Sequence, residues 1–197
     1  GLAGGVAFII SGAFLGLGLI SGLQLGFVYI LAPLMASLIG FLIYNRQPAR
    51  IFLGDAGSLF IGWTFSITSI LFAQKTAFSL SIVVPIIALG LPAFDVIFVM
   101  IKRFLGKHRY GFRGRWLKMF SADNTHIHHL LIKAGLSKRK TVWVLYLITL
   151  LTGVMAVLSW ITRESENYIF ILFFVFIFIF ILRFLIEWRI GRKHTTN

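Results

Sequence analysis

Six long runs of mostly apolar residues constrain the fold of this chain more than any other feature. A helix needs about 20 mostly apolar residues to cross the hydrocarbon core of a bilayer. Backbone groups in lipid must be satisfied internally, which favours helices over open strands. We therefore predict an all-α fold, a polytopic integral membrane protein with about six transmembrane helices. The predicted spans are approximately 4–21, 26–44, 58–74, 78–101, 141–161 and 167–186.

The composition and the placement of positive charge support this prediction. The chain is 58% hydrophobic and 13% charged, whereas soluble domains carry roughly 25% charged residues. With alternating spans, 17 of the 19 Lys and Arg residues fall on one side, and only Lys75 and Arg163 fall on the other. Lys and Arg are enriched in cytoplasmic loops. The loop 45–57, the long loop 102–140 and both chain ends are therefore expected in the cytoplasm, and the net charge of +13 needs no nucleic-acid partner.

The stretch FLGDAGS, residues 52–58, places Asp55 between two glycines at the start of a span. Gly54 and Gly57 would let backbone and ligand approach closely, and a helix N-terminus favours phosphate. A carboxylate there suits Mg²⁺, which takes oxygen ligands and bridges to substrate phosphates. The alternative is that Asp55 or Ser58 only caps the helix. One carboxylate does not make a metal site, so further ligands must come from elsewhere.

A second acidic residue, Asp95, lies within a predicted span. It precedes Lys102 by seven residues, which places it roughly 10 Å inside the span by helical rise. Pro92 is expected to loosen the helix just before it. An ionisable group at that depth is costly and usually faces a polar interior. Asp95 is therefore either a structural partner between helices or part of an active site.

Three histidines gather in SADNTHIHHLL, residues 121–131. A helix is expected to begin at Ser121, Asp123 or Asn124, all good N-cap residues. On such a helix Asp123, His126 and His129 would form one stripe, with His128 pointing elsewhere. Surrounded by Lys and Arg, the cluster would bind or protonate a phosphate group.

Other interpretations of this loop remain open. Zinc binding is one, although the HExxH spacing is absent and the chain has no cysteine. A solvated loop with incidental histidines is another. The basic stretch 102–118 could also bind anionic lipid head groups, with Phe112 and Trp116 in an interfacial role.

Four segments in this order resemble one family, the polyprenyl-phosphate N-acetylhexosamine-1-phosphate transferases. The sequence is similar to the undecaprenyl-phosphate N-acetylglucosamine-1-phosphate transferase branch and is related to phospho-N-acetylmuramoyl-pentapeptide transferase. HxHH, rather than HHH followed by an acid, argues against the latter branch. The matching segments are GLAGG (1–5), PARIFLGDAGSLFIG (48–62), PAFDVIFVMIKR (92–103) and ADNTHIHHLLIKAGLS (122–137).

The resemblance implies an activity. Residues 1–197 would be the C-terminal part of one membrane transferase domain, in the bacterial plasma (inner) membrane with its active site facing the cytoplasm. The enzyme would transfer N-acetylhexosamine-1-phosphate from a UDP-N-acetylhexosamine to polyprenyl (undecaprenyl) phosphate and release UMP, as the first membrane step of a cell-envelope glycan pathway. Mg²⁺ would be the cofactor, with Mn²⁺ as a substitute. Membrane lipids and a second copy in a homodimer are the further expected partners.

The resemblance also implies roles for individual residues. Asp55 would be a metal ligand, and His126, His128 and His129 would act on the sugar phosphate. Asn124, Thr125 and Leu130 stand in ADNTHIHHLL where the usual pattern reads ADRxHxHHRL, so both arginines of that pattern are replaced. The family's other acidic residues would precede Gly1, so residues 1–197 alone are expected to be inactive. The implied substrate-binding residues are Phe52, which would stack on uracil, with Gly54, Gly57, Ser58, Asp95, Asp123 and Asn124.

Two functions of other classes compete with the transferase. In a transporter or flippase subunit, Asp55, Asp95 and the histidines would form an ion or proton path. Transporters typically place such groups near the bilayer midplane, whereas these cluster at the cytoplasmic edge. A membrane scaffold would explain the charge of the long loop but not Asp55 between its glycines.

Overall fold

The computed structural model describes residues 1–22, 24–74, 85–105, 126–162, 171 and 173–186, and the regular elements within these ranges are all helices. The predicted all-α fold is therefore confirmed. A short helical stretch at 85–88 precedes α5, and an apolar helix, Phe173–Ile186, ends the described chain. The labelled helices are α1 (Leu2–Ile20), α2 (Gln24–Asn45), α3 (Gly54–Gln74), α5 (Gly90–Leu105), α7 (Ile127–Lys133) and α8 (Lys138–Thr162).

Four of these helices are long and apolar enough to cross a bilayer, which confirms a multi-pass membrane protein. They correspond to the predicted spans 4–21, 26–44, 58–74 and 141–161. The predicted spans 78–101 and 167–186 lie partly outside the described residues, so a total of six stays a prediction. The four observed segments are Leu2–Ile20, Gly26–Asn45, Gly54–Phe72 and Lys138–Ile161.

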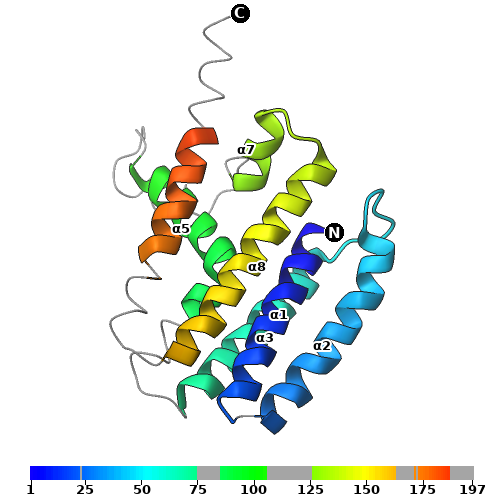
Figure 1. The fold of residues 1–197 in the computed structure, drawn as a ribbon. Coiled ribbons are helices and arrows are strands. Elements are labelled where there is room, and N and C mark those ends of the chain that lie inside the picture. Colours follow the sequence, from blue (N-terminus) through cyan, green and yellow to red (C-terminus); the bar gives the residue numbers. More distant parts are fainter. Residues whose placement is uncertain (23, 75–84, 106–125, 163–170, 172, 187–197) are drawn as a thin grey trace, which may run out of the picture.

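The main core surrounds α1, which packs against α2, α3 and α8 (Figure 1). Phe14 is fully buried and stacks on Phe65 of α3, with ring centroids 5.9 Å apart. Gly5 allows a close approach of α1 and α8, because a Cβ at this position would overlap the Tyr146 ring. Interhelical contacts in membranes rely on such small residues and on close packing.

The predicted loosening near Pro92 is confirmed. Residues 85–88 are helical, Leu89 is a turn residue, and α5 resumes at Gly90. Pro92 has no N–H to donate to the preceding turn, whereas the flanking hydrogen bond from Ala93 N to Leu89 O remains, at 3.0 Å. The helix that carries Asp95 therefore starts one residue before the Leu91–Pro92 pair.

Hydrogen bonds connect several segments at one end of the bundle. The Gly1 nitrogen donates to Asn45 O at 2.9 Å, and the Tyr146 hydroxyl donates to Gly1 O at 2.5 Å. Asn45 Nδ2 in turn donates to Ile51 O at 2.6 Å, which fixes the loop before α3. The starts of α1 and α8, the end of α2 and the FLGDAGS loop therefore lie at the same end (Figure 1).

Helix α7 lies at this end as well (Figure 1). Its apolar side chains pack on the N-terminal half of α8 and on the end of the last helix. The loop 45–57 and residues 126–140 of the loop 102–140, both of which the distribution of Lys and Arg assigns to the cytoplasm, thus share one end of the bundle. The contact is made by Ile127, Leu130 and Leu131 of α7 with Leu145, Ile148 and Ile186.

Candidate active site

Asp55 lies in the first turn of α3, where its side chain is exposed. Gly54 before it has φ +65°, a conformation that glycine adopts without steric cost. The Ser58 hydroxyl donates to the Asp55 carbonyl at 2.9 Å, so this hydroxyl is used as a donor within the turn. Within the described residues, we find no hydrogen-bond or ion-pair partner for the Asp55 carboxylate. Its position beside the free N–H groups of a helix start is favourable for an acid and for a bound anion.

The residues around Asp55 keep this helix start open. The Leu53 side chain packs against Gly57, where an added Cβ would come within 2.8 Å of the leucine side chain. Phe52 projects outward with 80% of its surface exposed. An exposed aromatic ring three residues before an exposed carboxylate suits stacking on a planar ligand. The stacking role of Phe52 and the binding roles of Gly54, Gly57 and Ser58 remain predictions.

The donor set for a metal ion is incomplete in the described part of the chain. No group of three His, Asp or Glu side chains there is placed to hold a metal ion. The exposed Asp55 carboxylate is a suitable oxygen ligand for Mg²⁺. Asp55 would therefore fit one ligand position of a Mg²⁺ site, whose other ligands would come from outside the described residues; this site stays a prediction.

The start of α7 differs from the prediction. The helix begins at Ile127, with His126 as its N-cap residue in an extended conformation (φ −61°, ψ 150°). The predicted stripe is therefore wrong for His126 and His129, because His126 precedes the helix. The reason lies in tertiary structure: Asp95 Oδ1 of α5 accepts the Ile127 N–H at 3.0 Å. Asp95, from another helix, therefore replaces the local N-cap side chain that the sequence predicted.

The three histidine rings lie together, so the expectation that His128 points elsewhere is also wrong. The His128 and His129 ring centroids are 4.1 Å apart, and those of His126 and His128 are 6.0 Å apart. Burial, reinforced by the neighbouring His129 and His126, lowers the pKa of His128, against an opposing effect of Asp95. The uncharged form of His128 is therefore favoured near neutral pH.

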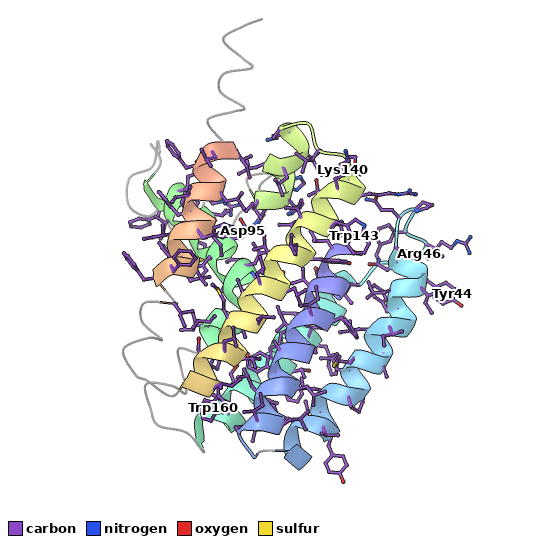
Figure 2. The ribbon with its side chains drawn as sticks, in the orientation of Figure 1. Tyr44, Arg46, Asp95, Lys140, Trp143 and Trp160 are labelled. Carbon is purple, nitrogen blue, oxygen red and sulfur yellow. The ribbon has the colours of Figure 1, made fainter. Side chains whose placement is uncertain are left out.

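Asp95 is bound by three protein donors. Besides the Ile127 N–H, its Oδ2 lies 3.0 Å from His126 Nδ1, and its Oδ1 accepts from Arg183 Nη1 at 2.9 Å. The carboxylate thus joins α5, the start of α7 and the last helix (Figure 2). The interpretation of Asp95 as a structural partner between helices is confirmed, and its substrate-binding role stays a prediction.

A basic groove of about 810 Å³ opens at the same end of the bundle, between the end of α2 and the start of α8. Arg46 and Trp143 lie on its two sides (Figure 2). The described lining contains no acidic residue, which makes the groove attractive to anions. The charged and aromatic lining residues are Arg46, Arg50, Arg139, Tyr44, Trp143 and Tyr146.

Two predicted site residues cannot be placed, and three residues near the site were not predicted to have a structural role. Asp123 and Asn124 lie outside the described residues. Neither Asn45, which holds the loop before α3 through Ile51 O, nor Tyr146, which bonds to Gly1 O, was predicted from sequence. Arg183 was expected only as a positive charge of the C-terminal tail. An arginine in an apolar span needs a partner, so the pattern at 173–186 contained a usable signal.

The sequence matches known proteins along most of its length. The profile of Glycosyl transferase family 4 matches residues 1–73, and this match supports the family resemblance of the motifs. Among solved structures, none matches this chain significantly.

Three relatives illustrate these similarities. A protein of Bacillus subtilis (strain 168), named probable undecaprenyl-phosphate N-acetylglucosaminyl 1-phosphate transferase, is 45% identical over 123 residues, which are 62% of this chain and 32% of the relative. An undecaprenyl-phosphate alpha-N-acetylglucosaminyl 1-phosphate transferase of Yersinia pestis is 29% identical over 98% of this chain and 51% of its own length. A phospho-N-acetylmuramoyl-pentapeptide-transferase of Desulforamulus reducens is 28% identical over 79% of this chain and 42% of the relative. The chain therefore spans about half the length, or less, of these relatives.

Proposed function

We propose that the complete protein transfers N-acetylglucosamine-1-phosphate from UDP-N-acetylglucosamine to polyprenyl phosphate and releases UMP. The observation that carries this proposal is the shared position of two motifs. The FLGDAGS loop and the histidines at the start of α7 lie at one end of the bundle (Figure 1), although some 70 residues of sequence separate them. The names of the relatives from Bacillus subtilis and Yersinia pestis support the lipid phosphate as acceptor and N-acetylglucosamine-1-phosphate as the transferred group.

The chemistry of this end suits an anionic, water-soluble donor and a lipid acceptor. The exposed start of α3 offers free N–H groups to phosphate oxygens, and the histidine rings offer further donors. The groove lined by Arg46, Arg50 and Arg139 adds positive charge at the same level. A polyprenyl phosphate reaches such a site from the bilayer, and a UDP-sugar reaches it from the cytoplasm.

The residues would divide the work as follows. Asp55 would hold Mg²⁺ together with acidic residues outside the described chain, and the metal would neutralise charge on the diphosphate when bound. His126 and His129 would hold oxygens of the sugar phosphate through hydrogen bonds. Phe52 would position the uracil by stacking. An oxygen of the polyprenyl phosphate would then attack the β-phosphorus while UMP leaves.

The test is an assay of the purified complete protein in nanodiscs with undecaprenyl phosphate and Mg²⁺. We expect UMP and a lipid-linked diphospho-sugar to form in equal amounts from UDP-N-acetylglucosamine, and turnover with UDP-N-acetylgalactosamine to be slower. Chelation of the divalent metal should stop the reaction, and Mn²⁺ should restore part of it. Formation of free sugar phosphate without a lipid product would contradict the proposed transfer.

A further inference from the structure

We propose that Asp95 and Arg183 are positioning residues, which fix the ring orientation and tautomer of His126 so that its Nε2 faces an anionic phosphate ligand. The identity of that ligand as a sugar diphosphate rests on the proposed function. The geometry of the His126 ring does not rest on the proposed function, because it follows from contacts within the protein.

Three groups of the protein surround the Asp95 carboxylate. Its Oδ2 lies 3.0 Å from His126 Nδ1, and its Oδ1 receives the Ile127 N–H at 3.0 Å and Arg183 Nη1 at 2.9 Å. The two Asp95 oxygens thus contact different groups. One holds the imidazole, and the other holds the start of α7 and the cation of the last helix.

The Asp95 carboxylate also decides which ring nitrogen of His126 carries a proton. An ionised carboxylate can only accept hydrogen bonds, so the His126 nitrogen that faces it must carry the proton. This nitrogen is Nδ1, whether the imidazole is neutral or charged. Nε2 is then the ring nitrogen left for a ligand, as an acceptor in the neutral ring and as a donor to phosphate in the charged ring. With 32% of its side chain exposed, His126 is open to such a ligand.

Arg183 is buried beside this carboxylate. Its side chain is only 2% exposed, and its guanidinium lies 4.2 Å from the centroid of the Phe98 ring. A buried cation requires a charge partner and is costly without one. Phe98 and Asp95 lie on the same helix, α5. Arg183 therefore holds the carboxylate against α5 while leaving Oδ2 for the histidine.

The Asp95 carboxylate contacts both the His126 ring and the backbone at the start of α7. His126 is the N-cap residue of α7, and Asp95 fixes the first N–H of that helix as well as the His126 ring. A merely structural ion pair between α5 and the last helix would require neither contact. The structure thus connects the last helix, beyond the matched residues 1–73, to the candidate active site.

The experiment compares wild type with Asp95→Asn in the complete protein, labelled with ¹⁵N-histidine in nanodiscs. His126 signals are assigned by their loss in His126→Gln. In wild type we expect His126 in the Nδ1–H form, with Nε2 unprotonated at high pH. An asparagine oxygen can still accept the Ile127 N–H, while its amide group donates to Nδ1. We therefore expect the Nε2–H tautomer in Asp95→Asn. We expect kcat/KM to fall by about 10- to 100-fold, because the charged imidazole, the stronger donor to phosphate, loses the carboxylate that stabilises it.

Two matched variants separate this proposal from the proposed function. Asp55→Asn makes the same chemical change at the other described acid, and we expect it to remove turnover while leaving the His126 tautomer unchanged. Arg183→Gln should shift the His126 signals in the direction of the Asp95→Asn spectrum. If wild type shows no turnover with a UDP-sugar, the proposed function fails while the tautomer still tests the positioning.

Three outcomes would overturn the positioning proposal. One is an Nε2–H tautomer of His126 in wild type, which is measurable even if Asp95→Asn does not fold. Another is a His126 spectrum that is the same in wild type and Asp95→Asn. The third is a changed tautomer in Asp95→Asn with kcat/KM equal to that of an active wild type.

Discussion

Replacing Asp55 with Asn should reduce UMP release from the complete protein by about 10³-fold or more, with normal accumulation in the membrane. Asp55 is exposed at the start of α3, so the change removes no buried contact that supports the fold. A metal ion contributes several kcal/mol of charge stabilisation in the transition state, and each 1.36 kcal/mol is worth tenfold in rate. Asparagine keeps the size of the side chain but lacks the charge that binds Mg²⁺. Initial rates at saturating UDP-N-acetylglucosamine, over a range of Mg²⁺ concentrations, measure the effect.

Ser66→Ala is the matched control for this change. Ser66 lies further along α3, where its exposed hydroxyl donates only to Gly62 O of the same helix, at 2.9 Å. The control should keep wild-type turnover and the same thermal unfolding midpoint as Asp55→Asn. Wild-type turnover in Asp55→Asn, with an unchanged Mg²⁺ dependence, would remove Asp55 from the metal site.

Replacing either His126 or His129 with Ala should lower kcat/KM by about 10- to 100-fold, whereas Lys138→Ala should lower it less than about fivefold. A hydrogen bond to a charged group contributes about 1.5–3 kcal/mol. An exposed charge at a distance contributes about 0–1 kcal/mol. Lys138 is exposed at the start of α8 and is therefore a suitable control for general positive charge near the histidines.

The dependence on salt provides a second readout for this comparison. Attraction by exposed charges is screened at high ionic strength, so the small effect of Lys138→Ala should shrink further there. The effects of the two histidine variants should persist. Equal losses in all three variants, with the same salt dependence, would mean that the cluster contributes only general basic attraction.

The helical fold was accessible from sequence because lipid restricts the choices of the backbone. Runs such as 26–44 and 141–161 contain almost nothing but apolar residues, and helices of matching length occupy both. The distribution of Lys and Arg also grouped the FLGDAGS loop with the histidine loop, and both lie at one end of the bundle (Figure 1). Composition, length and charge decide these features locally, so no tertiary information was required.

The local structure of the site was less accessible because contacts between distant segments decide it. The pattern at 121–131 offered Ser121, Asp123 and Asn124 as helix caps, yet Asp95 accepts the first N–H of α7 from another helix. The same carboxylate also contacts the His126 ring, with 3.0 Å between Asp95 Oδ2 and His126 Nδ1. The pairing of Asp95 with Arg183 joins residues 88 positions apart. Only the general rule that buried charges pair pointed toward it.

Paramagnetic broadening by Mn²⁺ offers a test of whether Asp55 and the histidines act on the same ligand. The complete protein, labelled on histidine, would be titrated with Mn²⁺ in the presence and absence of UDP-N-acetylglucosamine. If Asp55 holds a metal-bound diphosphate that the histidines also contact, the His126 and His129 signals should broaden strongly with both ligands present, and Asp55→Asn should abolish this broadening. Sharp His126 and His129 signals at saturating Mn²⁺ and UDP-N-acetylglucosamine, or broadening that persists unchanged in Asp55→Asn, would contradict a shared site.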